Sequence, residues 1–238
     1  LVSAFSAEGI SFNIKGGTAG LGAIPIEYYP KVIFPILSQV GLEANLEIIK
    51  RGYYPKGGGQ VKVVVESQKP QGRIDLVESG RLTLIEGISI ASSGLAHRKV
   101  SERQAQKAEE ILKREYSVPV NIKSEYVPTL SYGSEINLYA YTDKGSILGS
   151  DALGERQKTA EEVAKEAASK LIKEIESGAA VDSHLADNLI PWLCLLGGTI
   201  KTSQVSLHTQ TNIWVSELFF GKVFLELSKK EIHSIGYY

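Results

Sequence analysis

Methionine is absent from the 238-residue sequence, cysteine occurs once, and neither sign of charge is in clear excess. A single cysteine excludes an internal disulfide framework and any cysteine-rich zinc site. Cys194 lies in an apolar run, which is typical of a buried, unreactive thiol. With 26 Lys and Arg residues against 27 Asp and Glu residues, the chain is not a polyelectrolyte DNA-binding protein. This balance leaves room for a local basic patch that binds one end of a nucleic acid.

Long apolar runs and targeting signals are also missing. The longest apolar stretches are short or broken by polar residues, so no membrane span is expected. No charged segment followed by an apolar one marks a secretion signal, and we expect a cytoplasmic protein. Apolar residues make up 43% of the chain and charged residues 22%, as in a globular protein with one large or two small domains. The first residues, Leu1-Val-Ser-Ala-Phe5, read as the end of an element already under way, so we expect an N-terminal part to precede them.

The first third of the chain predicts strands at residues 10–15 and 42–50, with a helix between them at 26–40 that Pro35 shortens or kinks. The segment Arg51-Gly-Tyr-Tyr-Pro-Lys-Gly-Gly-Gly59 then leads into a strand at 60–66. The simpler interpretation is a hairpin in which glycines supply positive φ angles. The alternative is a backbone cradle for phosphate with Arg51 and Lys56 beside it. It is not a Walker A loop, because the lysine precedes the glycines and no helix follows.

Residues 70–81 are expected to form a linker, and residues 82–176 a separate α/β module. Within the module we expect strands at 82–91, 118–127 and 135–142, and helices at 101–116 and 158–175. Ser101-Glu-Arg-Gln104 matches a capping box for the first helix. The order of elements is therefore βαββα. Its charges are expected to face solvent, and it contains no catalytic constellation.

The last part of the chain begins with an apolar helix at 182–196 that Asp187 and Asn188 interrupt. Polar groups in such a helix need partners, which a structural network, a ribose hydroxyl or an adenine edge would each provide. A strand at 199–205, a helix to residue 220 and strands at 222–227 and near 232 follow. This order is similar to that of residues 10–67, a weak sign of internal repetition.

A run of polar residues, Ser206-Leu-His-Thr-Gln-Thr-Asn212, precedes the apolar run Ile213-Trp-Val215. Thr209 or Thr211 is expected to cap the following helix by accepting a hydrogen bond from its first N–H groups. The N-terminal end of a helix attracts phosphate, so His208 would lie beside an anion site where an imidazole could attack phosphorus. The alternative is a histidine in a turn with a structural hydrogen bond.

Three segments together resemble the RNA 3′-terminal phosphate cyclases: Arg51-Gly-Tyr-Tyr-Pro-Lys-Gly-Gly-Gly59, Leu185-Ala-Asp-Asn188 before Pro191, and His208-Thr-Gln-Thr-Asn212. Gly16-Gly-Thr18, followed by Pro25 and Tyr28, is a looser fourth match. The resemblance implies an α/β (α+β) protein whose large domain is built from repeated βαβαββ units. A small thioredoxin-like βαββα domain at 82–176 would be inserted, with 1–81 and 177–238 forming the large domain.

The resemblance also implies a reaction and its site. Such enzymes use ATP and a divalent cation (Mg or Mn) to adenylate a histidine, here matched by His208. They transfer the AMP to an RNA 3′-phosphate, and the 2′-oxygen then attacks to give a 2′,3′-cyclic phosphate. By the same match Pro25, Tyr28 and His184 are expected around the adenine, with Asp187 and Asn188 near the ribose. A neutral imidazole is a competent nucleophile near pH 7, provided that a partner fixes its other nitrogen.

The sequence departs from the family pattern in several places. The Gly-rich N-terminal motif with its metal-binding acid and phosphate-binding arginines is not in these residues, so the metal ligands are unknown. Asn188 stands where the family commonly has Gln, and His184 where it often has an aromatic residue. The main alternative is a non-catalytic cyclase-like protein acting in ribosome assembly, although His208 argues against it. An enolpyruvyl transferase, with similar repeated units, is disfavoured by the inserted module and the histidine motif.

Overall fold

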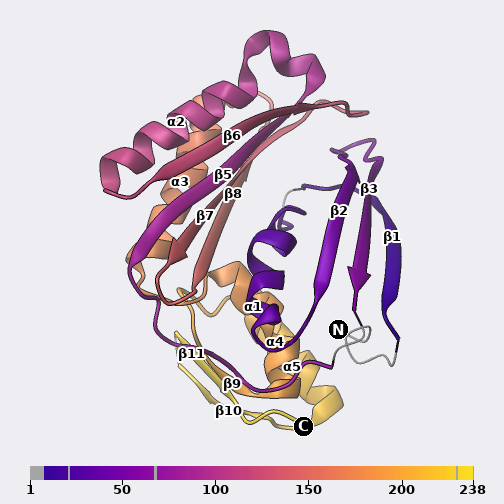
Figure 1. The fold of residues 1–238 in the computed structure, drawn as a ribbon, viewed down its shortest axis with the longest axis vertical. Helices are drawn as coiled ribbons and strands as arrows, with labels where there is room; N and C mark the ends of the chain where they lie inside the picture. The colour runs from indigo at the N-terminus through magenta and orange to yellow at the C-terminus, as the bar shows by residue number, and fades with distance from the viewer. Residues whose placement is uncertain (1–7, 21, 67–68, 229, 238) are drawn as a thin grey trace.

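The computed structural model describes residues 8–20, 22–66, 69–228 and 230–237. The expectation about Leu1–Phe5 therefore lies outside the described residues. Three sheets and their helices make up the molecule, with a small sheet on each side of a central helical region and a long sheet above (Figure 1). Within the described ranges, every helix is too short or too polar to cross a membrane.

The first sheet has the strand order β1-β3-β2, and both pairings are antiparallel. Its strands are β1 (Ile10–Gly16), β2 (Ala44–Lys50) and β3 (Gly59–Val65). The connection from β1 to β2 contains one turn of π-helix, η2 (Tyr29–Ile33), and the short helix α1 (Phe34–Ser38). The helical segment therefore spans 29–38, within the expected 26–40, and Pro35 lies in the first turn of α1, where the π-helical turn passes into the α-helix.

Residues 82–176 form the long sheet with two helices on one of its faces (Figure 1). The strand order is β6-β5-β7-β8, with β5 parallel to β6 and the other neighbours antiparallel. The elements are β5 (Leu82–Ser92), η3 (Ser93–Arg98), α2 (Val100–Glu115), β6 (Val120–Val127), β7 (Ser134–Thr142), β8 (Ile147–Leu153) and α3 (Ala160–Glu176). This part has an apolar core of its own, formed where the inner faces of α2 and α3 meet the sheet.

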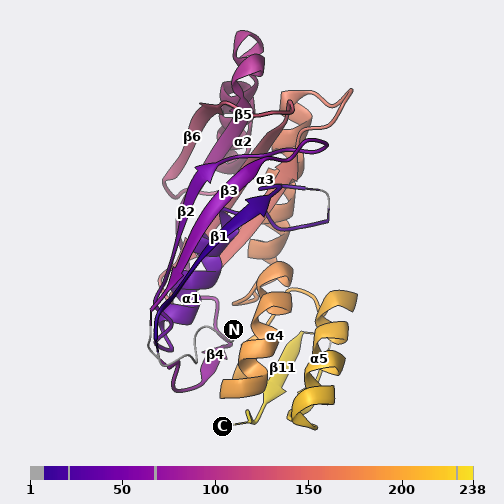
Figure 2. The same ribbon diagram turned by 90° about the vertical axis from the view of Figure 1, so that its right-hand side faces the viewer.

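The third sheet, β10-β11-β9-β4, is covered by two helices that lie side by side (Figure 2). Its elements are β4 (Ile74–Leu76), α4 (Ser183–Leu196), β9 (Gly198–Lys201), α5 (Leu207–Phe220), β10 (Phe224–Leu227) and β11 (Glu231–Ser234). Strand β4 pairs parallel with β9, and the other pairings are antiparallel. The order β9-β11-β10 matches β1-β3-β2, and a helix follows the first strand in both sets.

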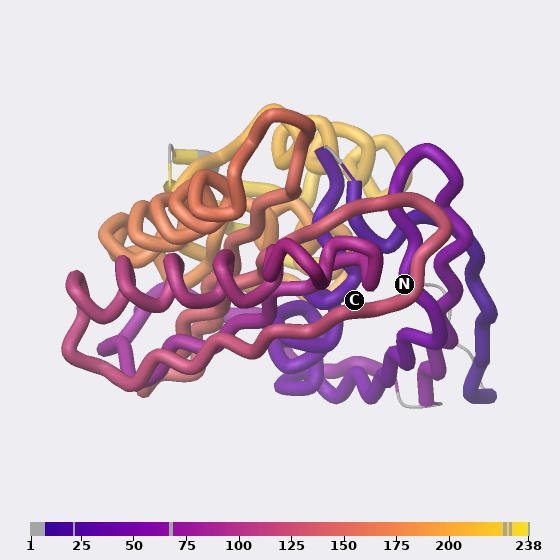
Figure 3. Tube along the Cα trace, turned by 90° about the horizontal axis from the view of Figure 1, so that it is seen from above, coloured from indigo at the N-terminus to yellow at the C-terminus, as the bar shows by residue number. Residues whose placement is uncertain are grey.

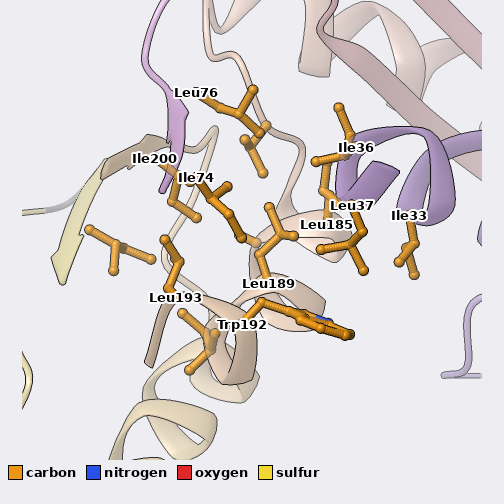
Figure 4. Close-up of a cluster of buried hydrophobic side chains, with 14 of the residues drawn as sticks. Ile33, Ile36, Leu37, Ile74, Leu76, Leu185, Leu189, Trp192, Leu193 and Ile200 are labelled. Carbon is orange, nitrogen blue, oxygen red and sulfur yellow. The ribbon is translucent and has the colours of Figure 1, made fainter. Parts of the chain in front are cut away.

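The main core joins α4 to η2, α1 and the third sheet. Leu185, Leu189 and Leu193 lie one helical turn apart, and each is completely buried. Figure 4 shows them between Ile36 and Leu37 on one side and Ile74 and Ile200 on the other. Burial on nearly all sides explains why α4 is apolar around most of its circumference. Cys194 is fully buried in this helix, as predicted, and burial raises the pKa of its thiol to about 11.

Some element predictions were wrong, and each error has a local cause. The linker at 70–81 contains β4, which is only three residues long and depends on pairing with β9. The βαββα order omitted β8, whose residues are buried with little alternation. Ser101-Glu-Arg-Gln104 is not a capping box: the Ser101 hydroxyl donates to the Ser89 carbonyl, and the Gln104 side chain accepts from the Ser89 hydroxyl.

Candidate functional site

His208 lies in the first turn of α5, with its side chain 77% exposed. The prediction that Thr209 or Thr211 caps this helix was wrong, because the N-cap residue is Ser206. The Ser206 hydroxyl accepts from the Thr209 N–H at 2.9 Å, and the Thr209 hydroxyl accepts from the Ser206 N–H at 3.2 Å. This reciprocal pair is a capping box in which threonine takes the place of the usual Glu or Gln. It fixes the backbone on both sides of His208.

Asp187 of α4 connects this helix start to the rest of the site. One carboxylate oxygen accepts hydrogen bonds from the hydroxyls of Ser206, at 2.7 Å, and Thr209. The other oxygen lies 4.0 Å from Nδ1 of His208. The Asp187 side chain is only 15% exposed, so little water competes for its charge. The carboxylate therefore supports the capping box and places a negative charge near the Nδ1 atom of the imidazole.

A proline in α4 provides a second link between α4 and α5. Pro191 has no N–H, so the carbonyl of Asp187, four residues earlier, loses its partner within the helix. The side-chain amide of Asn212 donates to that carbonyl at 2.9 Å. Pro191 and Asn212, which lie 21 residues apart in the sequence, thus form one structural unit. The unit aligns the first turn of α5 against the polar part of α4.

The N-terminal turns of α4 carry the other predicted site residues. His184 is exposed, Asn188 is half-buried, and the Asn188 amide donates to the His184 carbonyl at 2.8 Å. With Asp187 they occupy neighbouring positions on one side of the helix, since residues three and four apart share a face. The structure therefore brings His184, Asp187 and Asn188 together and places His208 beside them.

Tyr28 lies on the inner side of this group and is only 2% exposed. Its ring meets that of His184 edge to face, with centroids 6.4 Å apart, and packs so closely on Gly149 that a Cβ there would be 2.4 Å from it. The Tyr28 hydroxyl donates to the carboxylate of Asp182 at 2.6 and 2.7 Å. These contacts favour a supporting role for Tyr28 beneath His184, and its contact with adenine stays a prediction.

Asp182 was not singled out from the sequence, although an aspartate directly before an apolar helix is a common N-cap. It is completely buried and accepts from the N–H groups of His184 and Leu185, both at 2.9 Å. It also accepts from the Gly149 N–H of β8 at 2.7 Å. Burial raises the pKa of Asp182, while these donors act in the opposite direction. The carboxyl joins η2, β8 and α4 at one point.

Pro25 is buried, and its carbonyl accepts from the Tyr28 N–H at 3.0 Å. The loop before it borders a largely apolar cavity of about 410 Å³ between the first sheet and α1. Asn188 and Trp192 of α4 also line this cavity, together with Gly17 and Thr18. Pro25 itself is near the group through Tyr28, and its contact with adenine also stays a prediction.

The segment from Arg51 to Gly59 is a hairpin connection, as the simpler interpretation predicted, with positive φ at Gly57 and Gly58. Arg51 is not available for phosphate, because its guanidinium is buried against the carboxylate of Glu27 and lies 3.7 Å from that of Glu135. The phosphate cradle is therefore wrong as far as Arg51 is concerned. Lys56, by contrast, is exposed.

The start of α5 places unpaired backbone donors beside an imidazole. In the described part of the chain, the capping box leaves the N–H groups of Leu207 and His208 without an acceptor. These donors and the helix dipole suit a phosphate beside the imidazole. Within the described residues, no group of three or more His, Cys, Asp or Glu side chains could hold a metal ion. Fold and site define an α/β protein with an exposed histidine beside unpaired backbone donors at a helix start.

Comparison with known proteins identifies the family. A model of the RNA 3′-terminal phosphate cyclase family matches residues 1–225. The chain is 43% identical over 221 residues to the RNA 3′-terminal phosphate cyclase of Pyrococcus abyssi, covering 93% of this chain and 64% of that protein. It is 42% identical over 224 residues to the protein of that name from Thermococcus kodakarensis, covering 94% and 64%. It is 36% identical over 238 residues to the RNA 3′-terminal phosphate cyclase of Methanopyrus kandleri, covering 97% of this chain and 67% of that protein.

The chain belongs to the RNA 3′-terminal phosphate cyclase family. It spans 64% of the length of the Pyrococcus abyssi and Thermococcus kodakarensis relatives.

Proposed function

We propose that this protein cyclises RNA 3′-terminal phosphates at the expense of ATP, with His208 as the residue that accepts AMP. Family membership supports the overall reaction. The observation that carries the proposal is the His208 imidazole, which is exposed at the start of α5 with Nδ1 4.0 Å from the Asp187 carboxylate. A side chain held at a helix N-terminus by a capping box can meet a phosphate without further rearrangement of the backbone.

In the first step, Nε2 of His208 attacks the α-phosphorus of ATP. The P–N bond forms as the bond to the bridging oxygen breaks, and pyrophosphate leaves. Asp187 stabilises the positive charge that develops on the ring, because its second carboxylate oxygen faces Nδ1. The free N–H groups of the first turn of α5 bind the phosphate oxygens.

In the later steps, an oxygen of the RNA 3′-phosphate attacks the same phosphorus, and the P–N bond breaks to release His208. The neighbouring 2′-hydroxyl then attacks the 3′-phosphorus, loses its proton to solvent and expels AMP. The product carries a 2′,3′-cyclic phosphodiester. These are displacements at phosphorus, so positioning and charge stabilisation supply most of the catalysis.

For the nucleotide, we assign the adenine to the surface beside His184, above the buried Tyr28 and Pro25, and the ribose to Asn188 and Asp187. The adjacency of His184, Asp187 and Asn188 on α4 supports this arrangement. The divalent cation would neutralise phosphate charge, and its ligands are not assigned to this chain. RNA with a 3′-phosphate is the proposed partner.

The finer description of the fold is likewise part of the proposal. We assign residues 82–176 to an inserted thioredoxin-like domain, and 1–81 with 177–238 to a large domain of repeated units. The separate apolar core of the middle segment supports the first assignment. The shared strand order of β1-β3-β2 and β9-β11-β10 supports the second.

The proposal is tested by incubating the protein with ATP, Mg²⁺ or Mn²⁺ and an RNA that ends in a 3′-phosphate. Resistance of that end to phosphatase reports cyclisation. We expect conversion by the parent and a loss of at least ~100-fold in His208→Asn, because an amide cannot carry AMP. Conversion by His208→Asn at the rate of the parent would refute the role of His208.

The alternative is a non-catalytic cyclase-like protein acting in ribosome assembly. It would fail to convert the RNA end in any form. The presence of His208 with a supporting carboxylate favours the enzyme. The family match over residues 1–225 argues against an enolpyruvyl transferase.

A further inference from the structure

Two tyrosines on neighbouring loops are exposed to an unusual degree. Tyr54, between β2 and β3, is 87% exposed, and Tyr132, between β6 and β7, is 75% exposed. The two loops touch, because the Lys56 N–H donates to the Ser131 hydroxyl at 3.1 Å. Figure 3 shows the β6–β7 loop reaching across to the β2–β3 loop at one end of the molecule. The aromatic rings therefore belong to a single surface that combines two parts of the fold.

The first loop is held from inside by the tyrosine that precedes Tyr54. Tyr53 is 4% exposed, and its hydroxyl donates to Glu135 of β7 at 2.9 Å. Its ring packs on Gly133, where a Cβ would be 2.3 Å away. The motif is therefore buried over residues 51–53, with Arg51 and Tyr53 directed inward. Tyr54 and Lys56 remain outside on a backbone that is already fixed.

The second loop is fixed in a similar way. The ring of Tyr132 lies directly over Gly94 of η3, where a Cβ would be 2.2 Å from it. The Ser92 hydroxyl donates to the Ser131 and Gly133 carbonyls, both at 3.2 Å. Rigid loops hold exposed rings in place before a ligand arrives, which reduces the entropy lost on binding.

Positive charge accompanies the two rings. Lys56 follows Tyr54 on its loop, and Arg98 ends the η3 turn on which Tyr132 packs. Both side chains are exposed, and within the described part of the chain neither forms an ion pair. Exposed aromatic rings and unpaired cations on neighbouring loops are the features that bind single-stranded nucleic acid, through base stacking and phosphate contacts. A protein partner would be expected to require a larger apolar area and fewer unpaired charges.

We infer that Tyr54, Lys56, Arg98 and Tyr132, here named the two-tyrosine surface, bind the single-stranded part of the RNA upstream of its 3′ end. This inference rests on the proposed function. Figures 1 and 2 show the β2–β3 loop above α5 and toward the same side of the molecule, so a strand bound at the start of α5 can run toward the two loops. The segment from Arg51 to Gly59 thereby has two roles. Its buried residues pack against the middle segment, and its exposed residues bind substrate.

The test uses fluorescence anisotropy without ATP, with a ten-nucleotide single-stranded RNA and a dinucleotide competitor, both ending in a 3′-phosphate. We expect Tyr54→Ala/Tyr132→Ala to bind the longer RNA at least ~10-fold more weakly, since stacking contributes about 1–3 kcal/mol per base. Tyr54→Phe/Tyr132→Phe keeps the aromatic faces and should bind within about twofold of the parent. Binding of the dinucleotide should be unchanged in both. Lys56→Ala/Arg98→Ala should weaken the salt dependence of binding to the ten-nucleotide RNA. The slope of log binding constant against log salt concentration should become about 1.4 less steep, or about 0.7 for each phosphate that a cation no longer neutralises.

Phe219→Ala is the matched control, because Phe219 is an equally exposed aromatic residue, at 78%, on the far end of α5. It should bind both RNAs as the parent does. The inference is overturned if the Ala variant binds the longer RNA as tightly as the parent, if the dinucleotide is weakened as much as the longer RNA, or if the parent binds neither. Failure of the proposed function would appear separately, as a parent that binds RNA through these residues yet does not accept AMP from ATP.

Discussion

At the residue scale, Asp187 contacts both the start of α5 and the histidine within it. Its first carboxylate oxygen serves the hydroxyls of Ser206 and Thr209, and its second faces Nδ1 of His208. The structural role and the electrostatic role therefore belong to different atoms of one side chain. Substitutions that keep one and remove the other can separate them.

Asp187→Asn retains an acceptor for the two hydroxyls but loses the negative charge near His208. We expect a thermal midpoint within about 2 °C of the parent. Transfer of AMP to the protein should be about 100-fold slower, because a group that stabilises the charge developing on the ring is lost. Asp187→Ala should lose both properties, leaving the capping hydroxyls without their acceptor. A normal rate in Asp187→Asn would contradict the electrostatic role.

The candidate site residues came from the resemblance of several motifs to one family, and their partners could not be predicted. Taken by themselves, His208 fitted either a structural turn or a nucleophile, and Asp187 and Asn188 fitted either a structural network or a nucleotide contact. That Asp187 bonds Ser206, and that Asp182 bonds Tyr28, depends on contacts across 19 and 154 residues of sequence. No local pattern encodes such pairs. Ser206-x-x-Thr209 was visible as a capping-box pattern only if threonine is accepted at its fourth position.

At the scale of elements, a proline inside α4 creates the hydrogen bond that joins α4 to α5. Pro191 frees the Asp187 carbonyl within α4, and Asn212 of α5 donates to that carbonyl instead. The proline thus specifies how the two helices align. A buried carbonyl without a donor costs about 1–3 kcal/mol, so the link has a measurable energy.

Asn212→Ala should destabilise the protein by about 1 kcal/mol, measured by urea unfolding. The loss should shrink in a Pro191→Ala background, because the new N–H of residue 191 can satisfy the Asp187 carbonyl within α4. The comparison forms a double-mutant cycle with a coupling of about 0.5–1 kcal/mol. Equal losses in the two backgrounds would show that Asn212 acts in some other way.

Element prediction succeeded where periodicity is strong and local. The apolar stripe of α3 and its Thr159–Glu162 capping box are complete within one segment, and the helix was predicted within two residues at its start and one at its end. The prediction failed for β4, which is defined by β9, and for β8, which is buried with little alternation. It also failed for the start of α2, where Ser101 and Gln104 bond to Ser89 on a strand. Each failure is a tertiary contact that overrides a local preference.

At the scale of the whole molecule, the middle segment is joined to the rest through buried polar groups. Alternate residues of β7, including Glu135, Asn137 and Tyr139, face away from α2 and α3. Glu135 meets Arg51 and Tyr53 there, with Glu27 nearby. Burial, reinforced by the charge of Glu27, raises the pKa of Glu135 to about 8.

This carboxyl makes stability depend on pH. Because its pKa is about 8, Glu135 is protonated in the folded protein below that pH, but it ionises near 4.5 once unfolded. The folded state therefore holds the extra proton between these values, and its stability falls as the pH rises, by on the order of 1 kcal/mol per pH unit from about 6 to 8. Glu135→Gln, which cannot ionise, should show a flatter profile of thermal midpoint against pH across that range. Glu47→Gln, at an exposed position of β2, should keep the profile of the parent. A Glu135→Gln profile as steep as that of the parent would exclude this explanation.

The central claim is that His208 accepts AMP, and labelled ATP tests it most directly. The protein is incubated with ATP labelled in the α-phosphate and a divalent cation, then denatured and separated from free nucleotide. A P–N bond to histidine predicts a label that is lost in acid and kept in alkali, and that lies on the peptide containing His208. His208→Asn should carry none. Label that persists in His208→Asn, or that maps to another residue, would contradict the account.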